Sequence, residues 1–97
     1  MGKTYFVYIL ASKRNGTLYT GVTDKLAERI WQHKEGVADS FTKKNNVKIL
    51  VYVESYPTPQ EAIHREKCIK RWKRDWKKEL IETQNPLWND LSASFMK

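Results

Sequence analysis

The strongest constraint on this chain is a pair of short apolar runs joined across an Asn-Gly dipeptide. Residues 6–10 read Phe-Val-Tyr-Ile-Leu, residues 18–21 read Leu-Tyr-Thr-Gly, and Asn15-Gly16 lies between them. β-Branched and aromatic residues favour strands, and Asn-Gly tolerates positive φ at both central positions of a two-residue turn. The sequence therefore predicts an antiparallel β-hairpin centred on Asn15-Gly16.

Two tyrosines lie on one face of this predicted hairpin. The predicted register places Tyr8 opposite Thr23 and Tyr19 opposite Ser12, about 13 Å apart along the strand. Alternate residues share a face, so Gly21 lies on the same face and leaves a gap that a backbone or a ligand can approach. A slip of two residues, or a bulge, would bring the tyrosines closer together.

A helix follows the hairpin. It is predicted over about residues 25–35, with Asp24 as its N-cap and Gly36 as its end. Leu26 and Ile30 are four residues apart and form its apolar stripe.

The second half of the chain contains a strand and two helices. Residues 47–56 are apolar at both alternating sets of positions, which predicts a central strand covered on both faces. Helices are predicted over about residues 60–72 and 74–83. Residues 37–46 are predicted to be an exposed basic loop, and residues 89–97 a frayed tail.

These elements and the composition predict one α+β domain over residues 1–97. The order β-β-α-β-α-α favours a small three-stranded, mainly antiparallel sheet flanked by helices. The chain has 97 residues, of which 40% are hydrophobic, and this supports one modest core.

The charge balance favours a polyanionic partner. Eighteen Lys and Arg against eleven Asp and Glu give a formal net charge of +7, which suits nucleic acid first and an anionic membrane surface second. The single cysteine, Cys68, excludes an intramolecular disulfide and a cysteine-based zinc site. No apolar run resembles a signal peptide or a membrane span, so we expect a cytoplasmic protein without a membrane partner.

Five polar side chains fall on faces that should be buried. They are Tyr8 and Tyr19 of the hairpin, Arg29 and His33 at the edge of the first helix's apolar stripe, and Glu66 amid apolar positions of the helix at 60–72. Each has an ordinary alternative, as a core tyrosine, a helix-flank residue or an ion-pair partner. The whole set is more informative than any member.

A basic segment occupies the second helical region. Residues 65–78 contain eight basic side chains, namely Arg65, Lys67, Lys70, Arg71, Lys73, Arg74, Lys77 and Lys78. Such a segment either tracks a nucleic-acid backbone or forms a solvated face. Trp72 and Trp76 lie within it, where they either pack against the sheet or stack on a base.

The two tyrosine motifs resemble the paired signature of the GIY-YIG nuclease superfamily. Val7-Tyr8-Ile9 is followed eleven positions on by Tyr19-Thr20-Gly21. Leu26, Arg29, His33 and Glu66 then follow in the family's order, so the resemblance covers residues 4 to about 88. The chain is most similar to small stand-alone bacterial proteins with this domain. Phe6, Val7 and Thr20 depart from the family's letters, and the family's late asparagine is matched best by Asn85, with Asn89 as the second candidate.

The resemblance implies a metal-dependent endonuclease that hydrolyses DNA phosphodiester bonds, an activity of the kind used in DNA repair. Glu66 would hold one divalent cation, Mg²⁺ or Mn²⁺, and Arg29 would neutralise the phosphoryl charge. Tyr8 would act as the base or orient the water, with Tyr19 supporting it, or the two roles would be reversed. His33 would relay the tyrosine proton or bind phosphate.

DNA is the expected partner, and RNA is a second candidate. The expected phosphate contacts are Lys67, Lys70, Arg71, Lys73 and Arg74, with Gly21 and Asn85 in supporting positions. A lone domain of this size would take its specificity from DNA structure or from a partner protein that targets it. The alternative function is a nucleic-acid-binding module with the same fold and little or no cleavage. A basic interaction module for an anionic protein or membrane is a third candidate.

Overall fold

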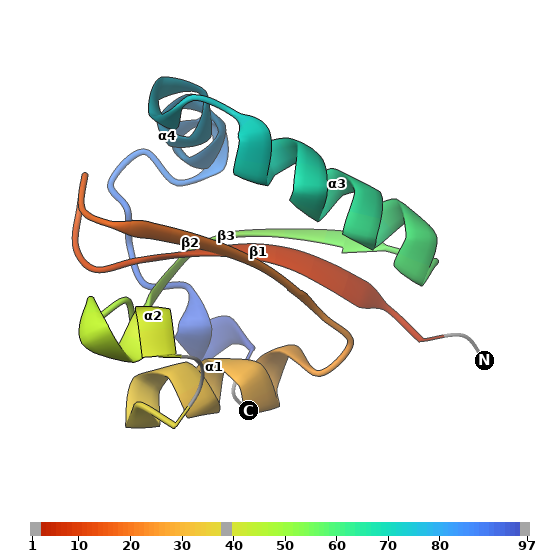
Figure 1. Ribbon diagram of the computed structural model, residues 1–97, viewed down its shortest axis with the longest axis horizontal. Helices are drawn as coiled ribbons and strands as arrows, with labels where there is room; N and C mark the ends of the chain where they lie inside the picture. The colour runs from red at the N-terminus through yellow and green to blue at the C-terminus, as the bar shows by residue number, and fades with distance from the viewer. Residues whose placement is uncertain (1–2, 38–39, 96–97) are drawn as a thin grey trace.

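The chain forms a three-stranded antiparallel sheet with helices on both faces (Figure 1). The computed structural model describes residues 3–37 and 40–95. The elements in chain order are β1 (Tyr5–Ala11), β2 (Leu18–Thr23), α1 (Leu26–Glu35), α2 (Ser40–Lys44), β3 (Ile49–Tyr56), α3 (Pro59–Arg71), α4 (Arg74–Gln84) and the 3₁₀ turn η1 (Ser92–Ser94). Within these residues, no helix has the length and apolar character needed to cross a bilayer. The predicted α+β class and sheet are confirmed.

Strand order is β2-β1-β3, so the predicted central position of β3 is wrong. The central strand is β1, which pairs antiparallel with both neighbours. β3 is an edge strand, yet its Leu50 and Val51 are fully buried because helices cover both faces of the sheet. Burial on both faces therefore reports the two helical layers and not the place of the strand in the sheet.

Alternation along β1 divides the core between the two faces of the sheet. Val7 and Ile9 join the cluster under α3 and α4, together with Ile69. Tyr8 and Leu10 join the opposite cluster, which includes residues of α1. Figure 1 shows the same division, with α3 and α4 on one side of the sheet and α1, α2 and the C-terminal turn on the other.

The hairpin turn lies one residue earlier than predicted. The Gly16 amide donates to the Lys13 carbonyl at 2.9 Å, which makes Arg14 and Asn15 the central residues. Asn15 takes φ 59°, whereas Gly16 does not have a positive φ. A positive φ at the third residue of a turn suits Asn, so the dipeptide marks the turn without being its centre.

This shift changes the hairpin register by two residues. Tyr8 lies opposite Gly21, and Leu10 lies opposite Tyr19. The predicted pairs are therefore wrong, while the predicted shared face holds because a slip of two preserves side-chain parity. The slip brings the two tyrosines closer, which matters for the site described below.

A bulge in β3 also breaks the alternation that the sequence suggests. Ile9 pairs with Tyr52 and Leu10 pairs with Leu50, so Val51 is the extra residue. Val51 and Tyr52 consequently both face the α3 and α4 layer.

Two connecting segments differ from their predictions. The predicted loop over residues 37–46 contains α2, while residues 38–39 lie outside the described residues. The N-cap of α1 is Lys25, and the carboxylate of Asp24 instead pairs with the Lys3 ammonium at 3.2 Å.

Residues 89–95 make specific contacts with the core, in contrast to the predicted frayed tail. The Leu91 amide donates to the Leu50 carbonyl at 2.8 Å, and the Asp90 carboxylate accepts from the Lys34 ammonium at 2.7 Å. Partial burial alone would raise the pKa of Asp90, but hydrogen bonds from Lys34 and Ser92 hold it below its ordinary value. The segment thereby pairs with the start of β3 at the edge of the sheet.

An ion pair fixes α3 to β3. The Arg65 guanidinium donates to both Glu54 carboxylate oxygens at 2.9 Å, and the Tyr52 and Tyr56 hydroxyls donate to the same carboxylate. Burial and the bond to Glu54 raise the pKa of Tyr56 to about 12. Burial alone would raise the pKa of Glu54, but hydrogen bonds from Arg65 and the tyrosines hold it below its ordinary value. Arg65, one of the eight basic residues, therefore belongs to the fold.

We predict that Glu54→Gln lowers the free energy of unfolding at pH 7 by about 2 kcal/mol, because it removes charge-assisted hydrogen bonds in a partly buried site. A lowered folded pKa gives stabilisation that is present above the unfolded pKa of about 4.3 and is lost as pH falls through the folded value. Urea unfolding at a series of pH values should show a difference from wild type that is constant above about pH 5 and shrinks as the pH falls further. The exposed Glu35→Gln is the control, and a difference independent of pH would contradict the prediction.

Candidate active site

The Tyr8 ring lies across Gly21 of the neighbouring strand. A Cβ atom added to Gly21 would lie 2.4 Å from the Tyr8 hydroxyl oxygen and 2.5 Å from Cζ. No real Cβ tolerates such contacts, so the ring requires glycine at this position. The gap that the sequence predicts at Gly21 is therefore filled by the Tyr8 phenol, and Gly21 serves to position it.

The Tyr8 hydroxyl reaches a buried histidine on α1. The Tyr8 oxygen lies 3.3 Å from Nε2 of His33, whose side chain is 2% exposed. Nδ1 of His33 lies 3.1 Å from the hydroxyl of Thr42 on α2. With a proton on Nδ1 donated to Thr42, Nε2 accepts the proton of Tyr8, and the reverse tautomer is equally compatible with these distances. Thr42, His33 and Tyr8 thus form a hydrogen-bonded chain inside the core.

Tyr19 completes an aromatic cluster with these two residues. Its ring centroid lies 6.4 Å from that of Tyr8 and 5.4 Å from that of His33. Tyr19 is only half-buried, so it forms the part of the cluster nearest to solvent. The structure therefore brings Tyr8, Tyr19 and His33 together, while their chemical roles stay predictions.

Glu66 approaches this cluster from the other layer. It lies on α3, which packs on the opposite face of the sheet and contacts β2 at the sheet edge. Its carboxylate is 2.7 Å from the Lys70 ammonium, and that ammonium lies 5.9 Å from the centroid of the Tyr19 ring. Lys70 thus connects Glu66 to the tyrosine cluster around the β2 edge.

Arg29 lies one helical turn before His33 on α1, but the two side chains differ in burial. His33 enters the core, whereas Arg29 is exposed. Arg29 lines a polar cavity of about 390 Å³ together with Lys3 and Lys25. Two carboxylates, Asp24 and Glu28, line the same cavity, and Asp24 pairs with Lys3, so the cations exceed the carboxylates by one.

The Asn85 side chain stabilises the fold through backbone hydrogen bonds and lies outside the tyrosine cluster. Its amide nitrogen donates to the Val51 carbonyl at 3.0 Å and to the Asn89 carbonyl at 2.9 Å. Its side-chain oxygen accepts from the Asn89 amide at 3.0 Å. Asn85 and Asn89, the two candidates for the late asparagine, therefore hold each other and tie the C-terminal segment to β3.

The predicted phosphate contacts separate into two groups. All five are exposed residues at the end of α3 and the start of α4, namely Lys67, Lys70, Arg71, Lys73 and Arg74. Arg74 donates to the carbonyls of Asn15 and Gly16 in the hairpin turn, and Lys70 pairs with Glu66. Lys67, Arg71 and Lys73 extend this surface with exposed positive charge.

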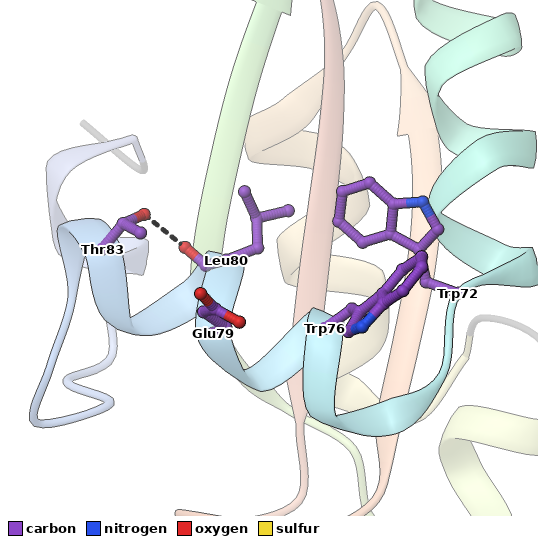
Figure 2. A pocket seen from close by; sticks show the side chains of 5 residues that line it. All are labelled: Trp72, Trp76, Glu79, Leu80 and Thr83. Atoms are coloured by element: carbon purple, nitrogen blue, oxygen red, sulfur yellow. Dashed lines mark hydrogen bonds between the residues drawn. The ribbon is translucent and has the colours of Figure 1, made fainter.

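A groove lies where α4 leaves the end of α3 (Figure 2). It has a volume of about 340 Å³ and is lined by Trp72, Trp76, Glu79, Leu80 and Thr83. The two indoles meet nearly edge to face, with ring centroids 6.1 Å apart. Trp72 packs against the core, whereas Trp76 is 55% exposed. Of the two predicted tryptophan roles, packing against the sheet or stacking on a base, packing applies to Trp72 and not to Trp76.

The sequence did not predict that Thr42 is part of the buried polar chain. It also did not predict the ion pair of Lys70 with Glu66 or the contact of Arg74 with the hairpin turn. Thr42 lay in a segment predicted to be an exposed loop, although it is 2% exposed. The i, i+4 spacing of Glu66 and Lys70 could have suggested their ion pair. The contact of Arg74 with the hairpin turn spans 58 or 59 residues, and no local pattern indicates it.

Known proteins match this chain over most of its length. The family model of the GIY-YIG catalytic domain matches residues 4–79, which include both tyrosines, Arg29, His33 and Glu66. A UPF0213 protein of Staphylococcus haemolyticus is 38% identical over 78 residues, covering 80% of this chain and 94% of the relative. A UPF0213 protein of Staphylococcus aureus is 38% identical over 79 residues, covering 81% and 95%.

A solved structure has the same fold. The solution NMR structure of a UPF0213 protein from Bacillus halodurans matches with a TM-score of 0.57 at 26% identity, covering 97% of this chain and 99% of that chain. The arrangement of helices on both faces of a three-stranded sheet is thus shared with that protein.

We predict that Gly21→Ala destabilises the protein by about 1–3 kcal/mol, because the added methyl group forces the Tyr8 ring to move. The same substitution in a Tyr8→Ala background should cost less than about 0.5 kcal/mol, because the ring is absent. Denaturant unfolding of the four proteins in this double-mutant cycle measures both costs. Equal costs in the two backgrounds would show that Gly21 does not act through Tyr8.

Proposed function

Because the chain belongs to the GIY-YIG family of nuclease domains, we propose that it is a divalent-metal-dependent endonuclease that hydrolyses DNA phosphodiester bonds. The observation that carries this proposal is the cluster of Tyr8, Tyr19 and His33 beside the ion pair of Lys70 and Glu66. Phosphodiester hydrolysis needs an oriented water, a proton acceptor and positive charge near the phosphoryl oxygens, and this edge of the sheet offers residues for each.

Glu66 suits a hard divalent cation such as Mg²⁺ or Mn²⁺. Its carboxylate already holds a cation, the Lys70 ammonium, at 2.7 Å. Among residues 3–37 and 40–95, no group of three or more His, Cys, Asp or Glu side chains could form a metal cage. A single carboxylate fits Mg²⁺, which keeps several waters and shares substrate phosphate. When bound, the cation would polarise the phosphate and stabilise the departing oxygen.

Tyr8 is our candidate for the group that orients or deprotonates the water. A phenol is a weak base at neutral pH unless a neighbour accepts its proton, and Nε2 of His33 lies 3.3 Å from the Tyr8 oxygen. Tyr19 lies beside both groups and supports them, and the reverse assignment of the two tyrosines is the second candidate. Arg29, exposed beside Lys3 and Lys25, would neutralise charge on the phosphoryl oxygens.

We further propose that the enzyme is directed by DNA structure. In intact duplex DNA the faces of the bases are stacked, whereas an unpaired base can stack on an exposed indole. Trp76 offers such an indole at the rim of the groove in Figure 2, close in sequence to the exposed cations Arg71 and Lys73. A partner protein that targets the domain is the alternative source of specificity, and RNA is the alternative substrate.

The proposed chemistry predicts a specific ranking of variants. Purified protein is incubated with nicked, branched or single-stranded DNA in Mg²⁺, Mn²⁺ or a chelator. Glu66→Ala and Arg29→Ala should abolish metal-dependent cutting, and Tyr8→Phe should slow it by about 100-fold or more while DNA binding stays normal. Tyr5→Phe, on the same strand, is the matched control.

Equal DNA-cleavage rates for Tyr8→Phe and wild type would show that Tyr8 neither orients nor deprotonates the water. Tight, salt-sensitive binding by wild type without any cutting would favour the binding module that keeps the fold without efficient cleavage.

A second prediction concerns the exposed indole. Trp76→Ala should weaken binding of single-stranded DNA by about 5- to 150-fold, the equivalent of one lost stacking contact, with little effect on duplex binding. Fluorescence anisotropy of labelled oligonucleotides measures both. Trp31→Ala is the matched control, because Trp31 is 51% exposed on α1. Equal losses for the two DNA forms would contradict a stacking role.

A further inference from the structure

Two ion pairs flank α3, and they differ in how firmly they are held. Two guanidinium nitrogens of Arg65 donate hydrogen bonds to the Glu54 carboxylate, which also accepts hydrogen bonds from two tyrosine hydroxyls. Lys70 meets Glu66 through one ammonium group at 2.7 Å. The first arrangement is rigid and bidentate, whereas an ammonium on a four-carbon stem can leave by rotating that stem.

The two members of the second pair have unequal access to solvent. The Glu66 side chain is 13% exposed, while that of Lys70 is 49% exposed. A carboxylate with so little access to water needs a cation or hydrogen-bond donors beside it. Lys70 meets this requirement and still has room to move into solvent.

The Lys70 ammonium also lies beside the proposed reaction centre. It is 5.9 Å from the centroid of the Tyr19 ring, within range of a cation–π contact. Lys70 thus holds positive charge next to the only carboxylate that we assign to the metal, and next to the half-buried tyrosine. A divalent cation on Glu66 and an ammonium at the same carboxylate would repel each other.

We propose that Lys70 is an exchangeable counter-ion that neutralises Glu66 in the free protein and transfers to the nucleic-acid backbone when a divalent cation binds Glu66. This inference rests on the proposed function, because it assumes that Glu66 is the metal ligand. Lys70 is a positioning residue in this scheme: it controls the charge on Glu66 and touches no reacting atom.

The exchange makes metal binding and nucleic-acid binding cooperative. A phosphate group near Tyr19 attracts the Lys70 ammonium and releases the Glu66 carboxylate for the metal. By linkage, the nucleic acid raises metal affinity by the same factor as the metal raises nucleic-acid affinity. In the free protein, metal affinity is low because Lys70 competes for the single carboxylate.

The test uses Mn²⁺ alone as the probe, with free Mn²⁺ followed by electron paramagnetic resonance. Each protein is titrated with and without a phosphorothioate oligonucleotide that resists cleavage. Lys70→Met keeps the length of the stem and removes its charge, and Lys70→Arg keeps the charge. Lys44→Met is the matched control, because Lys44 is an exposed lysine of α2 outside the predicted phosphate contacts. Glu66→Ala identifies binding at the proposed site, and circular dichroism checks that each variant is folded.

We expect Lys70→Met to bind Mn²⁺ about tenfold or more tightly than wild type in the absence of DNA, and to lose most of the affinity that DNA adds. Lys70→Arg and Lys44→Met should keep low Mn²⁺ affinity without DNA. Unchanged or lower Mn²⁺ affinity in Lys70→Met would overturn the proposal, as would tighter binding that persists in the double variant with Glu66→Ala.

These outcomes are separable from those of the cleavage assay. Metal-dependent cutting together with unchanged Mn²⁺ affinity in Lys70→Met would remove only the counter-ion role. If Lys70→Met shows the expected change in Mn²⁺ affinity but the wild-type protein does not cut DNA, the counter-ion role is supported and the proposed endonuclease activity is contradicted.

Discussion

The contact between the Tyr8 ring and Gly21 is the constraint on which the rest of the site depends. It exists because the hairpin pairs these two residues directly, and because residue 21 has no side chain. The ring can then lie across β2 and present its hydroxyl to His33 of α1. In the register that the Asn-Gly dipeptide suggests, Tyr8 would face Thr23 and the phenol would have no such place.

The hydrogen-bonded series that starts at the Tyr8 hydroxyl continues into the core. His33 lies between the hydroxyls of Tyr8 and Thr42, and both its neighbours are buried. Buried polar groups need partners, and partners with matched geometry fix their orientation. The cluster therefore has a rigid inner end, while Tyr19, with the Lys70 ammonium 5.9 Å from its ring centroid, forms its accessible side.

Sequence patterns predicted the elements and their faces, because these depend on local periodicity. Leu26 and Ile30 form the buried stripe of α1, and Tyr8 and Tyr19 share a face as predicted. The hairpin register could not be predicted, because Asn15 suits the third position of a turn as well as the second.

Long-range contacts explain the other failures. The edge position of β3 depends on which strands pair, and its apolar faces do not carry that information. A run of basic residues likewise cannot show which members are used by the fold. Arg65 binds Glu54 and Arg74 binds the hairpin turn, whereas Lys67 is exposed. Only the three-dimensional arrangement separates structural cations from those that face solvent.

The two ion pairs of α3 differ in what they connect. On the β3 side, Arg65 and Glu54 form a bidentate pair that holds the helix in place over the sheet. Glu66 instead pairs with Lys70 of the same helix, so this second pair does not join α3 to a strand. Exchange of the cation on Glu66 therefore need not disturb the packing of α3.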